Sequence, residues 1–220
     1  MTKKKPTLVV ASGDNHEASD KGRLGLDRLI FFSDAVFAIS ITLLVLEIRL
    51  PAMEGSITNA KLVSSLLGLW PKYLAYVISF LVIGIFWIAH HRRFQLIERY
   101  DNGLLFLNLL ELMGIAFIPF PTSVMNVHKG QAGVMFYSLV LTLTSLLSVA
   151  NWWYASHNNR LVSPRLDPRL RRRETWSGSF VFVSFLVSFG LDLVDDWLSR
   201  GGWSLAALVS WWLFRQPVRR

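Results

Sequence analysis

The amino-acid sequence predicts an all-α, polytopic membrane protein with six transmembrane helices. Hydrophobic residues make up 52% of the 220-residue chain, and they gather in runs of about 20 that are long enough, as helices, to cross a bilayer. Tryptophans lie near the ends of several runs, where the aromatic side chains of membrane proteins gather at the lipid–water boundary. These observations exclude an ordinary soluble domain.

The first two runs are bounded by proline. The first covers 29–50 and is stopped by Pro51, and a loop over 52–69 is expected to follow it. The second covers 70–89 and opens with a Trp-Pro pair, because proline suits the first turn of a helix. It ends before two histidines and two arginines, which we expect at the membrane surface.

Four further runs complete the predicted bundle. The third, 103–120, closes in the sequence Pro-Phe-Pro-Thr, and the fourth covers 132–154. The fifth covers 176–198. The sixth, 203–214, is short for a spanning helix, so its limits are the least well defined by the sequence.

The chain is therefore expected to form one transmembrane domain, 28–214, between two polar tails. The N-terminal tail, 1–27, has no apolar segment of the kind found in signal peptides, and we expect it to be disordered. The C-terminal tail, 215–220, is basic. The chain has no cysteine, which excludes a disulfide framework, a thiolate metal site and a thiol nucleophile.

The distribution of lysine and arginine predicts the orientation in the membrane. Eighteen of the 23 lie in the N-terminal tail, in the loops after the second and fourth runs, and in the C-terminal tail, whereas five lie on the other side. Because basic loops stay in the cytoplasm, both termini are expected there. The net charge of +8 then needs no nucleic-acid partner, since topology already accounts for it.

Asp34 is a carboxylate inside the first apolar run. A charge at this depth is unfavourable in lipid by about 2.5 kcal/mol or more, so that side of the helix should face protein or water. Asp34 then either lines a pathway or makes a buried contact between helices. We favour the contact, because polar groups within membranes also join helices to one another.

The opposite face of the same helix is apolar. Steps of three and four residues from Ile39 reach Thr42, Leu43 and Leu46, whereas Asp34 points about 140° away. Such a stripe is consistent with a pore lining. It is equally typical of a helix that packs against its neighbours, and its angular position alone does not separate the two.

Four polar or aromatic positions should lie at one depth in the inner leaflet. Asp34 lies near the cytoplasmic end of the first span, and Asn108 lies near the cytoplasmic end of the third. Trp87 and either His90 or His91 lie near the cytoplasmic end of the second span. We expect a buried polar network here, because lipid cannot satisfy such groups. The alternative is that the histidines only cap the span among the headgroups.

Three other charged features have two interpretations each. Glu111, in the middle of the third span, is either functional or a structural partner of another helix. Glu47, at the outer end of the first span, either attracts cations at a mouth or pairs with Arg49. The basic run 169–173 primarily keeps its loop inside the cell, with binding of anionic lipids as a second interpretation.

The motifs of most enzymes and of several channel classes are missing from the sequence. There is no phosphate-binding glycine loop, no HExxH, no GxSxG, no TVGYG-type filter and no regularly spaced arginine voltage sensor. The five histidines fall on both sides of the membrane, which excludes a metal site of recognisable spacing. We therefore expect neither an enzyme nor a resident cofactor.

The first span resembles the transmembrane protein 175 family of potassium channels. Its residues Arg28, Phe32, Ser33 and Asp34 match the RxxxFSD signature of the bacterial branch. The resemblance continues through about Thr122. It includes residues of the first three spans, namely Ala35 to Ile39, Thr42 to Glu47, Trp87, His90, His91, Phe94, Asn108, Pro119 and Pro121.

The resemblance implies a homotetramer of six-helix subunits around one pore, lined by the first helix. It implies that Ile39, Leu43 and Leu46 form an apolar constriction, with Thr42 adding a ring of hydroxyls. It also implies a packing network, made of Arg28, Ser33, Asp34, Trp87, His90 and Asn108. The permeant ion would be K⁺, and the location would be the plasma membrane of a prokaryote.

Two functions remain open at this point. The first is a potassium-preferring cation channel with passive conduction. The second is an ion- or proton-coupled secondary transporter that uses Asp34 and Glu111 as carriers. The transporter is disfavoured because the sequence lacks the paired inverted repeats and broken helices of many transporters.

Overall fold

The structure is a computed structural model, and it describes residues 11–51, 58–127 and 130–192, with side chains from Gly22 onward. Within these residues the fold is all-helical, apart from one isolated β-bridge between Ile97 and Val162. The sixth expected span, the basic C-terminal tail and residues 1–10 lie outside the described residues.

Seven α-helices and two short 3₁₀ turns follow one another in the described part of the chain. They are α1 (Ala11–Leu43), η1 (Leu44–Glu47), α2 (Asn59–Gly68), α3 (Trp70–Phe94), α4 (Asn102–Phe117), α5 (Pro119–Val127), α6 (Gln131–Ser156), η2 (His157–Asn159) and α7 (Pro168–Asp192). Five stretches of the described residues are long and apolar enough to cross a membrane, and they are Gly22–Glu47, Trp70–Phe94, Asn102–Val127, Gln131–Asn159 and Pro168–Asp192. They coincide with the first five predicted spans.

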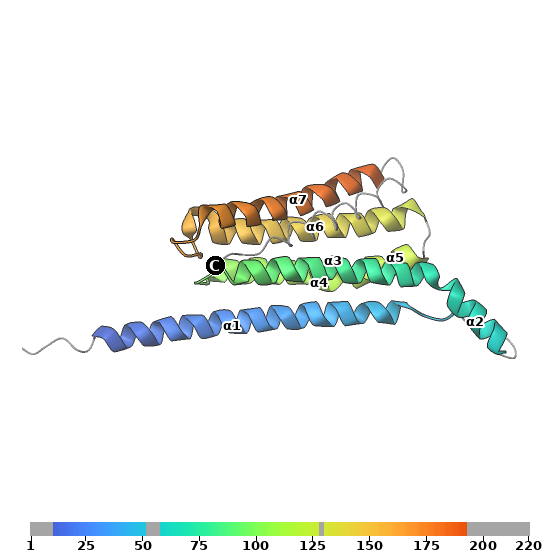
Figure 1. Ribbon diagram of the computed structural model, residues 1–220, viewed down its shortest axis with the longest axis horizontal. Coiled ribbons are helices and arrows are strands. Elements are labelled where there is room, and N and C mark those ends of the chain that lie inside the picture. Colours follow the sequence, from blue (N-terminus) through green and yellow to red (C-terminus); the bar gives the residue numbers. More distant parts are fainter. Residues whose placement is uncertain (1–10, 52–57, 128–129, 193–220) are drawn as a thin grey trace, which may run out of the picture.

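The helices form an elongated bundle with α1 along one edge and α7 along the other (Figure 1). Between these edges, α3, α4 and α5 contact α1, and α6 packs against α4, α5 and α7. A core of buried apolar side chains joins the layers, with Phe37 of α1, Ile83 and Phe86 of α3, and Tyr137 and Leu141 of α6 among them.

The first span differs from its prediction at both ends. Residues 11–27, expected to be disordered, are helical, since α1 begins at Ala11. A stable spanning helix acts as the nucleus, and adding further residues to it is far easier than starting a new helix. At the other end the α-helix stops at Leu43 and tightens into η1, which ends at Glu47, four residues before Pro51.

The prediction of a loop over 52–69 was wrong for the second half of this segment, which forms the helix α2. Its N-cap is Thr58, whose hydroxyl accepts a hydrogen bond from the Lys61 amide at 3.4 Å. The third span also extends beyond its expected end at 120. It breaks at Ile118, restarts at Pro119 and continues as α5 to Val127, because the proline removes a backbone donor.

The fifth span begins earlier than expected. The basic run 169–173 lies in the first turns of α7 and is not a loop. Similarly, α3 continues through the two histidines and two arginines to Phe94. Both helices therefore carry their charged residues beyond the apolar stretch on a rigid scaffold, and this brings them to the same end of the bundle.

Candidate functional site

The first spanning helix has two faces with opposite environments. Ser33, Phe37, Ser40 and Leu44, spaced by four, three and four residues, are each at most 1% exposed and face the rest of the chain. On the opposite side, the large apolar side chains of the predicted stripe are uncovered, with Ile39 58%, Leu43 41% and Leu46 59% exposed.

Thr42 is exposed within the same apolar stripe. Its hydroxyl donates a hydrogen bond of 2.8 Å to the carbonyl of Ile39, three residues earlier in the helix. This bond fixes the rotation of the hydroxyl and leaves the lone pairs of Oγ1 directed away from the backbone. The stripe thus has one ordered polar atom among its apolar side chains.

A chain of hydrogen bonds joins the buried face of α1 to α4 and α3. Asn108 donates from Nδ2 to Ser33 Oγ at 3.0 Å, and its Oδ1 lies 2.8 Å from His90 Nε2. The Ser33 hydroxyl donates to the Leu29 carbonyl at 2.9 Å. Because the Asn108 oxygen can only accept, His90 must carry its proton on Nε2.

The His90 ring is also held by aromatic neighbours. It stacks on Phe94 with ring centroids 4.1 Å apart and lies 5.4 Å from the ring of Phe37 on α1. The residue is 2% exposed, as expected for a structural group within a packed interface. The sequence left His90 and His91 as alternatives. In the structure His90 bonds to Asn108, and His91 stacks on Trp87.

Asp34 makes the second link between α1 and α3. Its Oδ1 accepts a hydrogen bond of 2.8 Å from the indole nitrogen of Trp87. The Trp87 ring stacks on His91, which lies 2.8 Å from Gln95 through Nε2. Asp34, Trp87, His90 and Asn108 therefore lie close together in the structure. They form two separate sets of hydrogen bonds, with Asp34 bonded to Trp87 and His90 bonded to Asn108.

Arg28 is not part of this arrangement. Its side chain is exposed and makes no hydrogen bond or ion pair with the residues that the structure describes. It lies 11 residues before Ile39, which places it within about 20° of the exposed stripe at 100° per residue. Glu47 ends η1, where its side chain is half-buried.

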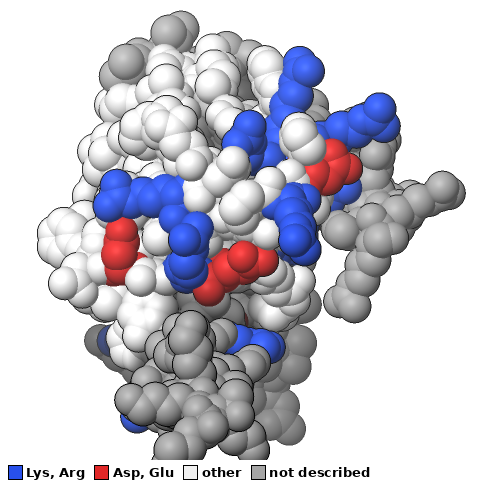
Figure 2. All heavy atoms as spheres, turned by 90° about the vertical axis from the view of Figure 1, so that its left-hand side faces the viewer, with Lys and Arg blue, Asp and Glu red and all other residues white. Residues whose placement is uncertain are grey.

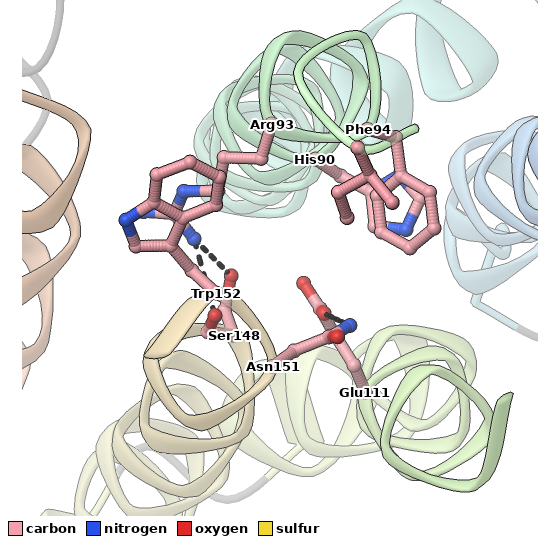
Figure 3. Close-up of a pocket in the computed structure, with 8 residues that line it drawn as sticks. His90, Arg93, Phe94, Glu111, Ser148, Asn151 and Trp152 are labelled. Carbon is pink, nitrogen blue, oxygen red and sulfur yellow. Dashed lines mark hydrogen bonds between the residues drawn. The ribbon is translucent and has the colours of Figure 1, made fainter. Parts of the chain in front are cut away.

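A second polar cluster lies deeper in the bundle, between α3, α4 and α6 (Figure 3). Glu111 is 1% exposed, and its Oε2 accepts a hydrogen bond of 2.8 Å from Asn151 Nδ2. Arg93 donates through Nη1 to the hydroxyl of Ser148 at 2.9 Å. Arg93 and Glu111 line the same cavity of about 10 Å³, which is room for one water molecule at most.

Sequence reasoning singled out Glu111 but not its neighbours. Asn151 and Ser148 lie in a span with few other signals, and Arg93 looked like a headgroup residue because it follows two histidines. Sequence reasoning also missed Glu174 near the start of α7, which is buried and pairs with Arg92. A buried carboxylate requires partners, but the sequence alone does not say which helix provides them.

The fold and the site together define a multi-pass, all-helical membrane protein whose first spanning helix has one packed face and one bare apolar face. Residues 28–119 match the family described as the endosomal/lysosomal potassium channel TMEM175. A relative from Streptomyces collinus, named as a potassium channel, is 37% identical over 82% of this chain and 89% of its own length. The chain belongs to the TMEM175 family.

Two further comparisons support this assignment. A protein of Chamaesiphon minutus, also named as a potassium channel, is 36% identical over 84% of this chain and 92% of its own. The crystal structure of a lysosomal potassium-selective channel TMEM175 homolog from Chamaesiphon minutus superimposes with a TM-score of 0.76 and 32% identity. It covers 87% of this chain and 99% of that one. The family resemblance seen in the sequence is thus confirmed.

Proposed function

We propose that this protein is a potassium channel, with passive conduction through a pore lined by α1. The observation that carries the proposal is the uncovered apolar face of this helix. Ile39, Leu43 and Leu46 are exposed although the other side of α1 is packed against α3, α4 and α5. Lipid could cover such a face as well as protein, and the potassium channels among its relatives are what favour a pore over lipid at this position.

Four subunits would surround the pore. In a homotetramer with α1 at the centre, each of Ile39, Thr42, Leu43 and Leu46 would form a ring of four identical side chains. Rings of isoleucine and leucine offer an ion no ligands, so an ion that passes must shed part of its hydration shell, or the constriction must widen and admit water. K⁺ holds its water less tightly than Na⁺, so the ring would favour K⁺.

The polar network would set the rotation of α1. The Ser33–Asn108–His90 chain and the Asp34–Trp87 bond attach one side of the helix to α4 and α3. Their role would be to hold the Ile39 stripe toward the axis. Arg28 is exposed on the stripe side, so we assign it to the inner end of the pore or to a neighbouring subunit instead of the packing network.

The orientation follows from the positive charges. We propose that both termini are cytoplasmic, with the transmembrane domain at 28–214 in the plasma membrane of a prokaryote. Glu47 at the end of η1 would then lie at the outer mouth, where a ring of four carboxylates would attract cations. The bacterial relatives support the cellular setting.

The transporter alternative gains no support from the positions of its two carboxylates. Asp34 is bonded to Trp87 between α1 and α3, whereas Glu111 is bonded to Asn151 between α4 and α6. They belong to different helix interfaces, with different partners. A transporter that used both carboxylates as carriers would need Asp34 and Glu111 along one pathway through the protein.

Current across a planar bilayer that contains the purified protein tests the proposal. A channel gives discrete current steps in symmetric KCl, because passive flux far exceeds the turnover of a carrier. Slow, saturable flux without resolvable steps, from protein that is folded and inserted, would favour the transporter.

A further inference from the structure

At the N-terminal end of α7, two arginines have no acidic partner among the residues that the structure describes. Most arginines at this end of the bundle have partners. Arg160 pairs with Asp101, Arg92 and Arg173 pair with Glu174, and Arg171 bonds to Asn159. Arg169 and Arg172, by contrast, are exposed, and their guanidinium groups bond to none of the described residues. Figure 2 looks onto this end and shows basic side chains spread over it.

These two arginines begin a stripe that runs along the outer face of α7. The stripe continues at helical spacing through exposed aromatic and aliphatic residues, namely Trp176, Phe180, Val183 and Val187. At 100° per residue all six positions fall within about 80° of one another. The opposite face of the helix is buried against α6, with Glu174, Gly178 and Phe185 on it.

The order of residues along the stripe matches the layers of one bilayer leaflet. Arg169 and Arg172 lie beyond the apolar part of the helix, and Trp176, 64% exposed, stands at the boundary where tryptophan prefers to lie. From Trp176 to Val187 the helix rises about 16 Å, close to the ~15 Å half-thickness of the hydrocarbon core. The stripe therefore has a charged part for a headgroup and an apolar part of one acyl-chain length.

We propose that this stripe is a binding site for an anionic phospholipid of the cytoplasmic leaflet. Guanidinium groups suit phosphate because they present two parallel N–H donors, and the two unpaired charges favour a headgroup with net negative charge. The acyl chain lies along Trp176, Phe180 and Val183. An acidic soluble protein would reach the arginines but would leave the apolar part of the stripe unused.

The position of α7 in the bundle supports lipid as the occupant. The helix lies at the edge away from α1 (Figure 1), so a pore at α1 places α7 at the periphery of the assembly. In this respect the inference rests on the proposed function. The binding itself is measured without ion flux, so a failure of the lipid site and a failure of the channel assignment are separable.

The test measures lipid binding to the purified full-length protein by native mass spectrometry. The probes are phosphatidylglycerol and phosphatidylcholine with identical acyl chains. The double variant Arg169→Gln/Arg172→Gln removes the charges of the stripe. Its matched control, Arg23→Gln/Arg99→Gln, removes two exposed arginines that lie outside the stripe.

We expect the wild-type protein to retain phosphatidylglycerol in preference to phosphatidylcholine. The stripe variant should bind phosphatidylglycerol about 25-fold more weakly, the product of roughly fivefold for each arginine near an anionic surface, and the control should bind it as the wild type does. Trp176→Ala should weaken binding of both lipids, because it removes apolar contact. Equal losses of binding in the two double variants would mean that overall positive charge, and not the stripe, binds the lipid, and this would overturn the proposal. A wild-type protein with no preference for phosphatidylglycerol would also overturn it.

Discussion

The indole nitrogen of Trp87 on α3 donates a hydrogen bond of 2.8 Å to Oδ1 of Asp34 on α1. The bond lies beside the one that joins the neighbouring Ser33 to Asn108. Two adjacent residues of α1 are thus attached to two different helices. This arrangement leaves α1 little freedom to rotate about its axis, which is what a pore-lining face needs.

Replacing Asp34 should damage assembly more than ion preference. Asp34→Ala leaves the Trp87 donor without its partner, at about 1–3 kcal/mol, and releases one of the two attachments of α1. In size-exclusion chromatography of the detergent-extracted protein, we expect a smaller or broader species. Asp27→Ala is the matched control, because Asp27 is an exposed aspartate on the same helix. A D34A protein that keeps the size of the wild type and differs only in selectivity would mean that Asp34 faces the pore.

Gly178 tests the importance of the buried Arg93. A Cβ at Gly178 would collide with Arg93 Nη2, so Gly178→Ala must displace a guanidinium that bonds to Ser148 of α6. We expect a loss of about 1–3 kcal/mol in stability, as for other overpacked sites. Gly190→Ala on the same helix meets nothing within 4 Å and should be neutral or slightly stabilising. Thermal unfolding in detergent compares the two, and equal melting temperatures would show that Arg93 shifts freely.

Part of this site follows from the sequence, because helical periodicity fixes directions. The spacing of Ile39, Leu43 and Leu46 predicted one common face, and the depths of Asp34, Trp87 and Asn108 predicted their proximity. Both were observed within the subunit. Which helix supplies a partner is a question of tertiary packing, so the links from Glu111 to Asn151 and from Arg93 to Ser148 were not predictable from local patterns. Arg28 is the reverse case, because the motif grouped it with Ser33 and the structure leaves it exposed.

The fold shows the same division. Long apolar runs predicted five spans that the structure contains, since length and hydropathy are properties of the segment itself. Their ends were less predictable. Thr58 begins α2 inside an expected loop, and α1 extends to Ala11 through a polar segment, because a helix continues where nothing stops it.

Asp101 should make the stability of its end of the bundle depend on pH in the acid range. Partial burial acts to raise the pKa of its carboxyl, but hydrogen bonds from the Leu104 amide, Tyr154 and Arg160 outweigh this and hold the pKa below its usual 3.8. A lowered folded-state pKa means that the stabilisation is complete above 3.8 and is lost as pH falls through the folded value. Asp101→Asn should therefore melt below the wild type at pH 7, and the difference should shrink toward pH 3. A difference that is constant with pH would exclude this role for the carboxylate.

The orientation is tested with single cysteines, which the chain allows because it has none of its own. A cysteine at Arg165, in the segment between α6 and α7, should be protected from an impermeant thiol reagent applied to intact cells. Thr58→Cys, at the start of α2, should be labelled as the control on the outer side. Labelling at 165 with protection at 58 would invert the topology and move Glu47 to the cytoplasmic mouth.

The proposed constriction at Ile39 predicts a change in selectivity on substitution with a polar residue. Four asparagine side chains would hydrate the ring and supply oxygen ligands, so that an ion no longer needs to shed as much water. Ile39→Asn should therefore raise conductance and lower the preference for K⁺ over Na⁺, whereas Ile39→Val, which keeps the ring apolar, should preserve the preference.

The reversal potential under bi-ionic conditions, with K⁺ on one side of the bilayer and Na⁺ on the other, measures this most directly. We expect the Ile39→Asn channel to reverse closer to 0 mV than the wild type, with the Ile39→Val channel remaining near the wild-type value. If the Ile39→Asn channel is folded and conducting but keeps the reversal potential of the wild type, Ile39 is not part of the constriction. This result would contradict the assignment of this α1 face to the pore.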